Sequence, residues 1–194
     1  LYKRHVYYNS KRSRKFVYGA HLKHLSSFGN ISGLSRAQFD RTKLGVYGGI
    51  NEKRYSVNGD IHYNNQGLHY YGISDTLNLD NDSIAQRYGD FGISGSYSSH
   101  IKDSAKLNYT LGMAYNNYRS IKPMDEAFED WRAKENLFAV TSSWLYKYGK
   151  ETYSADFNVR YNGYNYGIIN KSSNGLDTGL VLDNTVINLK PNIT

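Results

Sequence analysis

The sequence predicts an all-β protein, an antiparallel transmembrane β-barrel of the outer-membrane type. In Tyr55–Tyr63 every second residue is apolar or glycine, and Ser56, Asn58, Asp60 and His62 lie between them. This period of two places the two sets on opposite faces of a β-strand. The connections near residues 11, 52, 103 and 149 are expected to be short, and those near 31, 77, 126 and 173 long. Short turns that alternate with longer loops are typical of outer-membrane barrels.

The composition is compatible with this class of membrane protein. The mean hydropathy is −0.67, and 39% of the residues are hydrophobic. A transmembrane helix needs about 20 consecutive apolar residues, and the sequence has no such run. A barrel strand is apolar only at alternate positions, so a polar average is expected of it. The 20 Tyr, 18 Gly and two Pro fit many strands with aromatic belts and tight turns.

We expect about nine strands. The first four run over Leu1–Tyr8, Lys15–Ser26, Phe39–Ile50 and from Tyr55 towards Tyr71. In the second strand one face carries Phe16, Tyr18, Ala20 and Leu22. In the third strand one face carries Leu44, Val46, Gly48 and Ile50. The basic turn after the first strand and the turn at residues 51–54 are both short, whereas a polar stretch over residues 73–83 separates the fourth strand from the fifth.

The alternation continues through the second half of the chain. The fifth, seventh and eighth strands are expected over Gln86–His100, Ala133–Tyr148 and Tyr153–Asn162, and the ninth reaches Leu189. The sixth strand aligns Leu107, Tyr109, Leu111, Met113 and Tyr115 on one face. The long connection that holds Pro123 and Asp125–Asp130 is expected to contain a helical turn. A loop rich in Gly, Asn and Ser is expected over residues 170–179.

The apolar faces carry tyrosine at their ends. Such pairs are Tyr55 with Tyr63, Tyr109 with Tyr115, and Tyr153 with Tyr161. A lipid-facing band flanked by two aromatic girdles has this pattern. The alternative is a soluble β-sandwich whose apolar faces form the core, but a core favours Leu, Ile and Val throughout, whereas these faces also contain Gly and Ala.

The expected strand number is odd, whereas bacterial single-chain barrels close with an even number of strands. An open edge in lipid leaves backbone groups without hydrogen-bond partners. The chain starts at Leu1 without the charged and apolar regions of a signal peptide. We therefore expect residues 1–194 to form one partial outer-membrane barrel domain of a larger barrel, with no second domain.

Three segments resemble a known group of proteins: Phe16–Ser27, Leu68–Gly72 and Val186–Asn192. They are similar to parts of Bacteroidetes outer-membrane proteins of the TonB-dependent receptor-like type. In the full receptors the resemblance implies a 22-stranded barrel, a plug domain and energised uptake of large nutrients. Nothing in this sequence matches a plug or a TonB box, and no binding residue of the family matches a position here.

The polar faces supply the candidate site. The lumen-facing candidates are Asn58, Asp60, His62, Asp156, Asn158 and Arg160. Polar side chains of this kind line a water-filled or plugged lumen and tune its selectivity. The sequence predicts an outer-membrane receptor or channel component for solute uptake through a polar lumen. The alternative is a non-transporting structural or assembly subunit of an outer-membrane complex, and a third possibility is a surface enzyme built on a barrel.

No catalytic, metal or cofactor site is expected. The sequence has no nucleophile elbow, phosphate loop or zinc-binding helix motif, and it has no cysteine. His21 and His24 are three apart on a strand, so they point to opposite faces and do not chelate one ion together. The oxygen-rich loop with Asp75, Asn78, Asp80, Asn81 and Asp82 departs from the EF-hand spacing, and we interpret it as a solvated loop.

The formal net charge of +7 raises the question of nucleic-acid binding. The basic residues concentrate at turns, as in Lys11–Lys15 and Lys53–Arg54, and no recognition fold accompanies them. We expect no nucleic-acid partner. The expected partners are outer-membrane lipid and lipopolysaccharide, together with surface lipoproteins or other outer-membrane subunits, and the expected location is the bacterial outer membrane.

Overall fold

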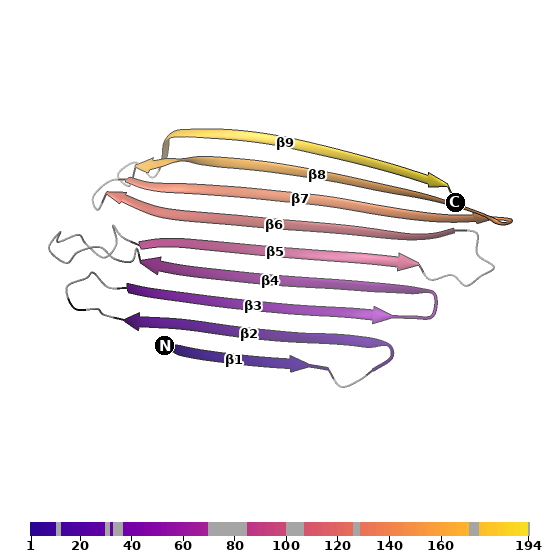
Figure 1. Cartoon of the computed structure of the whole chain (residues 1–194), viewed down its shortest axis with the longest axis horizontal. Coiled ribbons are helices and arrows are strands. Elements are labelled where there is room, and N and C mark those ends of the chain that lie inside the picture. The colour runs from indigo at the N-terminus through magenta and orange to yellow at the C-terminus, as the bar shows by residue number, and fades with distance from the viewer. Residues whose placement is uncertain are drawn as a thin grey trace.

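The chain forms one antiparallel sheet of nine strands in sequence order (Figure 1). The computed structural model describes residues 1–10, 13–29, 32, 37–69, 85–99, 107–125, 129–170 and 175–193. Each strand pairs with the next one along the chain, so every connection is a hairpin. The predicted all-β class, the antiparallel arrangement and the strand number are confirmed.

The strand bounds agree best with the prediction at the ends that carry the short turns. The strands are β1 (Tyr2–Asn9), β2 (Phe16–Gly29), β3 (Ala37–Asn51), β4 (Tyr55–His69), β5 (Ala85–Ser99), β6 (Leu107–Asp125), β7 (Glu129–Tyr148), β8 (Glu151–Asn170) and β9 (Gly175–Ile193). At their other ends, β6, β7 and β8 all run several residues beyond the predicted limits.

The register gives the sheet one apolar and one polar face. Directly paired residues of antiparallel strands share a face, and the centre of the apolar face is the row Val46, Ile61 and Ile93. These three residues are 45–47% exposed. No large side chain among the described residues is fully buried. The sheet therefore contains no apolar core of its own, and its apolar face is open.

Aromatic side chains border this apolar face near the short turns. Rings stack from strand to strand between Tyr55 and Tyr97, Tyr97 and Tyr109, and Tyr109 and Trp144, with centroid distances of 5.9, 5.6 and 5.4 Å. We call Tyr55, Tyr97, Tyr109 and Trp144 the turn-side aromatic row. Offset stacking of this kind contributes about 0.5–1.5 kcal/mol per pair beyond area burial.

A second group of aromatic residues borders the apolar face towards the other ends of the strands. Tyr63 pairs with Phe91, and Tyr115 pairs with Phe138, which in turn pairs with Tyr161. We call these five residues the loop-side aromatic row. Both aromatic borders that the sequence predicts are thus present on one face.

The short turns are fixed by local hydrogen bonds and one ion pair. The Ser13 hydroxyl accepts bonds from the backbone N–H groups of Lys15 and Phe16, at 3.2 and 3.1 Å. The Lys15 ammonium lies 2.6 Å from the Glu52 carboxylate of the next turn. Hydrogen bonding and attraction by this carboxylate raise the pKa of Lys15 above its ordinary value. Gly149 adopts a left-handed φ of 62° between β7 and β8, which glycine does without steric cost.

The predicted strict alternation of short and long connections is confirmed only in part. The connection over residues 70–84 is long, but β6 and β7 approach each other until only residues 126–128 separate them. The helical turn expected around Pro123 is wrong, because Pro123 and Asp130 pair within the β6–β7 ladder. The register shifts between Pro123 and Asp125. A bulge is one of the few places where proline is tolerated in a strand.

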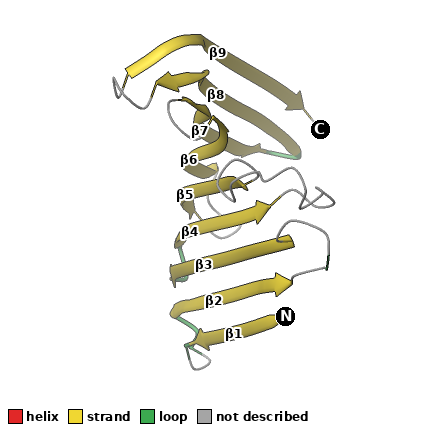
Figure 2. Cartoon of the chain, turned by 90° about the vertical axis from the view of Figure 1, so that its left-hand side faces the viewer, coloured by secondary structure: helices red, strands yellow, loops and turns green. Residues whose placement is uncertain are grey.

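The described strands form a single layer with two free edges. β1 and β9 lie at opposite ends of the strand order, and Figure 2 shows them far apart at the bottom and top of the molecule. Among the described residues, no helix is long and apolar enough to cross a membrane.

Candidate functional site

All six predicted site residues lie on the polar face of the sheet. Asn58, Asp60 and His62 alternate along β4, and Asp156, Asn158 and Arg160 alternate along β8. The ladder runs from Asp60 through Ser94, Ala114 and Ala139 to Arg160, so the two groups share one face. Three strands separate them, which corresponds to about 19 Å at ~4.8 Å per strand. The sequence therefore identified the face correctly, but the two groups do not meet.

The β4 group belongs to a polar network with β5. Asp90 accepts a hydrogen bond from the Asn64 amide at 2.7 Å, and its carboxylate lies 3.3 Å from Nε2 of His62. The other imidazole nitrogen lies 3.8 Å from Asp60, which accepts a hydrogen bond from the Ser94 hydroxyl. His62 is thus held between two carboxylates of neighbouring strands.

Glycines make room for the large polar side chains. A Cβ atom at Gly92 would lie 2.2 Å from Cε1 of His62 and 2.3 Å from Oδ1 of Asn116, and one at Gly45 would lie 2.2 Å from Cε1 of His21. These distances are shorter than van der Waals contact. The glycines that the sequence places at polar-face positions therefore allow the histidine rings to lie flat across the neighbouring strand.

A shallow hollow of about 180 Å³ contains two of the predicted residues, Asn58 and Asp60. On the polar face it is bordered by Tyr47, Ser94 and Ser96, with Gly49 at its base. The Tyr47 hydroxyl donates a hydrogen bond to Asn9 at 2.8 Å, which fixes the ring. Hydroxyl, amide and carboxylate groups meet here, and they suit hydrogen bonding to a polar solute.

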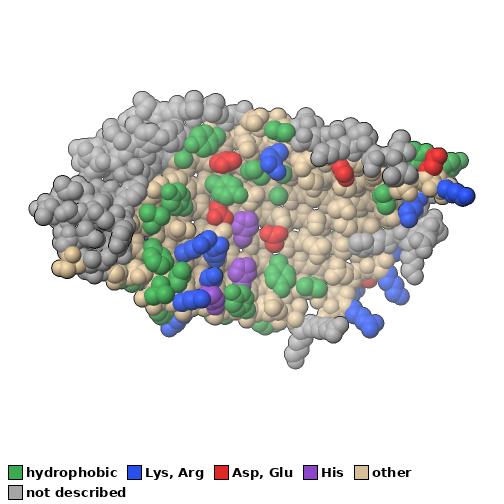
Figure 3. Space-filling view, viewed as in Figure 1, with side chains coloured by type: hydrophobic (Ala, Val, Ile, Leu, Met, Phe, Trp, Pro, Cys, Tyr) green, Lys and Arg blue, Asp and Glu red, His purple; other side chains and the backbone are tan. Residues whose placement is uncertain are grey.

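The polar face carries opposite charges over different strands. Figure 3 looks onto this face and shows a group of blue side chains at its lower left, over β1–β3, beside purple and red ones. The basic residues at polar-face positions of these strands are Lys3, Lys23, Arg41 and Lys43. Lys23 and Lys43 are directly paired, and like charges so placed repel each other. The first three strands are thus cationic, and the acidic residues follow from β4 onwards.

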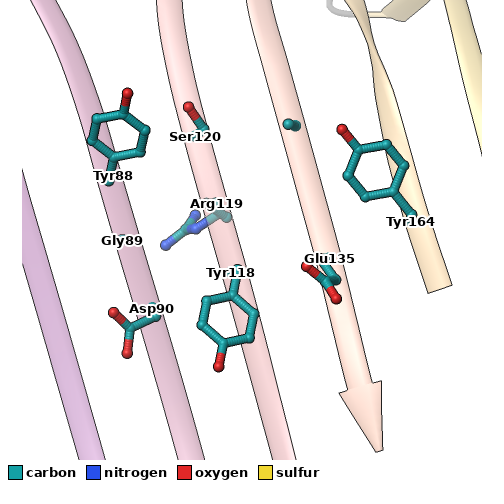
Figure 4. A pocket seen from close by; sticks show the side chains of 9 residues that line it. Tyr88, Gly89, Asp90, Tyr118, Arg119, Ser120, Glu135 and Tyr164 are labelled. Carbon is teal, nitrogen blue, oxygen red and sulfur yellow. The ribbon is translucent and has the colours of Figure 1, made fainter. Parts of the chain in front are cut away.

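A second hollow, of about 260 Å³, lies on β5–β8 and is rich in tyrosine (Figure 4). Asp90, Tyr118, Glu135 and Tyr164 are consecutive partners in the ladder, so carboxylates and phenol rings alternate across four strands. The next row consists of Tyr88, Ser120 and Ala133. The small side chains of this row leave the space that the three tyrosines border. We call Tyr88, Asp90, Tyr118, Glu135 and Tyr164 the tyrosine pocket.

This pocket is not among the sites that the sequence predicts. Its residues are polar-face positions that lie beyond the apolar segments used to recognise the strands. The sequence did contain a signal for this pocket. Tyr88, Tyr118 and Tyr164 occupy polar-face positions, where the aromatic girdles of a barrel are not expected. The residues of the pocket come together only through the register between neighbouring strands, and the sequence of a single strand does not specify that register.

The histidines predicted to point apart do so. His21 stacks on Tyr7 on the polar face with a centroid distance of 6.2 Å, whereas Nδ1 of His24 lies 2.9 Å from the Thr42 hydroxyl on the apolar side. Among the described residues, no three His, Cys, Asp or Glu side chains are grouped to hold a metal ion. The oxygen-rich loop with Asp75, Asn78, Asp80, Asn81 and Asp82 lies outside the described residues.

In comparisons with known proteins, no family model, no curated protein and no solved structure matches the chain.

Proposed function

We propose that the chain is part of the wall of a bacterial outer-membrane β-barrel, in which the polar face lines a lumen for solute uptake. The observation that carries this proposal is the exposed apolar face with an aromatic row on each side. Exposed apolar surface larger than a few hundred Å² marks a contact with a membrane or another protein. Lipid is the cover that also explains the two aromatic borders, because amphipathic rings lie at the level of the lipid headgroups.

The dimensions of the apolar face suit a bilayer. Tyr55 and Tyr63 mark its two borders on β4, and the nine residues from one to the other agree with the about 9–11 residues of a tilted transmembrane strand. Each large aliphatic side chain removed from water contributes about 1.5–3 kcal/mol. Without that cover a single sheet that lacks a core would be unstable.

The two free edges support a larger barrel. β1 and β9 each have one side without a partner strand in the described sheet. In lipid each unsatisfied backbone group costs several kcal/mol, so further strands are required to close the wall. The resemblance of Phe16–Ser27 to TonB-dependent receptor-like proteins of Bacteroidetes is consistent with a large barrel of this kind.

The proposed lipid partners include lipopolysaccharide. Arg119 and Lys134 are directly paired on the apolar face, just beyond the loop-side aromatic row. In the proposed orientation they lie at the level of the lipid headgroups on the side of the long connections. Two adjacent cations at this level suit the phosphate groups of lipopolysaccharide.

Fluorescence of Trp144 tests the lipid-facing assignment. The chain has two tryptophans, so Trp131→Phe leaves Trp144 of the turn-side aromatic row as the only one within residues 1–194, and its signal in the intact protein is the difference from the variant that carries both Trp131→Phe and Trp144→Phe. We expect lipids brominated near the headgroup to quench Trp144 in vesicles that contain the full protein, and a heat-modifiable gel mobility to show that it is folded. Solubility in plain buffer without quenching would contradict the membrane assignment and favour a sheet covered by protein.

Conductance separates uptake from an assembly role. If the polar face lines a lumen, the intact protein in a planar bilayer should pass ions or small solutes, and Asp60→Lys should shift its ion selectivity towards anions. A lipid-inserted protein with no conductance, and with no plug to block it, would favour the structural subunit instead.

A further inference from the structure

We propose that the tyrosine pocket binds the substituted ammonium group of a small solute. This inference names the ligand class of the polar face, and it rests on the proposed function in so far as that face must be open to solute. The pocket combines aromatic faces with carboxylates. These are the two groups that attract an organic cation, since the face of a phenol ring is electronegative.

The geometry of the central row carries the argument. Tyr118 on β6 lies between its two cross-strand partners, Asp90 on β5 and Glu135 on β7. Figure 4 shows the Tyr118 ring between the two carboxylates, with Tyr88 and Tyr164 on either side of the hollow. A cation placed on the Tyr118 ring would lie within the attraction of both negative charges.

The two carboxylates differ in their partners. Asp90 is held by Asn64 and His62, at 2.7 and 3.3 Å, so its position is fixed before a ligand arrives. Glu135 makes no hydrogen bond or ion pair with any described residue. A half-buried carboxylate beside aromatic rings gains from an added cation, and that is the charge a ligand would supply.

Among the described side chains, no arginine or lysine supplies this charge to Glu135. Arg119 borders the hollow, but the alternation along β6 assigns it to the apolar face, opposite Gly89. Arg160 on the polar face lies four residues along β8 from Tyr164. The polar-face lysines of the first three strands lie farther away, and Asn64 of β4 separates the nearest of them, Lys43, from Asp90.

The size of the hollow limits the ligand. A volume of about 260 Å³ that is open on one side accommodates a headgroup such as trimethylammonium, rather than a whole oligosaccharide or a peptide. A neutral sugar is the competing ligand, since it also stacks on tyrosine. We favour the cation because Glu135 has no ion-pair partner among the described residues, and Asp90 has only the His62 imidazole, so a neutral ring would leave the Glu135 charge uncompensated.

The test measures choline binding to the full protein in detergent by saturation-transfer NMR. The matched probe is 3,3-dimethyl-1-butanol, which has the same shape without the charge. We expect saturable binding of choline and none of the neutral analogue. Tyr118→Leu and Glu135→Gln should each weaken choline binding about 5- to 30-fold, whereas Tyr118→Phe should change it less than about twofold because the ring remains.

Two control variants match these changes elsewhere on the chain. Tyr63→Leu removes a tyrosine from the apolar face, and Glu151→Gln removes a carboxylate at the short-turn end of β8. Both should leave choline binding unchanged, and heat-modifiable mobility should show that every variant is folded. Equal binding of the two probes, choline binding that Tyr118→Leu and Glu135→Gln leave intact, or binding of glucose without choline would each overturn the proposal.

The outcome is separable from that of the membrane assignment. Choline binding that depends on Glu135, together with unquenched Trp144, would support the choline site and contradict the lipid-facing assignment. Quenching of Trp144 without choline binding would support the lipid-facing assignment and contradict the choline site.

Discussion

Individual residues on the two faces are under different constraints. On the polar face, Gly92 is needed because the imidazole of His62 occupies the space of its missing side chain. On the apolar face, a methyl group added at Gly48 would meet no atom within 4 Å, so a side chain would fit there. A Cβ atom would thus displace neighbouring side chains at Gly92 and meet open space at Gly48.

Alanine at these two glycines should separate the two cases. Gly92→Ala forces the His62 ring away from Asp90 and should lower the free energy of unfolding by about 1 kcal/mol, the usual contribution of one such polar contact. Gly48→Ala should leave stability unchanged or raise it by up to about 1 kcal/mol, because the unfolded chain loses freedom. Urea unfolding in lipid vesicles measures both, and equal effects would contradict the assigned role of Gly92.

At the level of elements, strands are joined by more than backbone hydrogen bonds. The turn-side aromatic row links β4 to β7 through consecutive ring contacts, and Tyr97 takes part in two of them. Its removal should therefore affect three strands together.

Tyr97→Leu should lower the free energy of unfolding by about 1–3 kcal/mol, since two ring pairs at ~0.5–1.5 kcal/mol each are lost while an apolar side chain remains. Tyr97→Phe keeps both ring pairs and should cost much less. The measurement is again urea unfolding in vesicles. If the leucine and phenylalanine variants were equally stable, ring stacking would not be the source of the stabilisation.

Neighbouring positions on β5 test the two faces of one strand. Ile93 lies at the centre of the apolar face and Ser94 on the polar face. Lysine at 93 should lower the stability of the protein in lipid by about 2–4 kcal/mol, as expected for a charge near the middle of a bilayer. Lysine at 94 should cost less, because it meets water and the Asp60 carboxylate. Folding into vesicles measures the difference, and similar losses at both positions would contradict a wet polar face.

At the scale of the whole molecule, the two free edges of the described sheet show that the proposed barrel needs further strands. A nine-stranded sheet in lipid cannot leave β1 and β9 unpaired. We expect the outward N–H groups of β1 to be covered by further strands in the intact protein.

Hydrogen–deuterium exchange of the intact protein in vesicles tests this expectation. Peptides that cover Tyr2–Asn9 should be protected nearly as well as those from β5, which pairs on both sides. Fast exchange of β1 beside slow exchange of β5 would identify β1 as a true edge, and would contradict closure by neighbouring strands.

The sequence by itself determined the class, the number of strands and the two faces. The reason is local: in a strand the face of a side chain depends only on whether its position is odd or even. Asn58, Asp60 and His62 could therefore be assigned to one face from a single segment. Where both faces become polar, as in β6 beyond Tyr118, the pattern ends although the ladder continues, so strand ends and the Pro123 bulge were missed.

Only the tertiary structure decided which residues meet. The register between strands depends on turn geometry and on hydrogen bonds between distant segments. It places Asp90, Tyr118, Glu135 and Tyr164 in one row, while it leaves three strands between Asp60 and Arg160. The tyrosine pocket is consequently a property of the assembled sheet, whereas the polar face that contains it was already present in the alternation of the sequence.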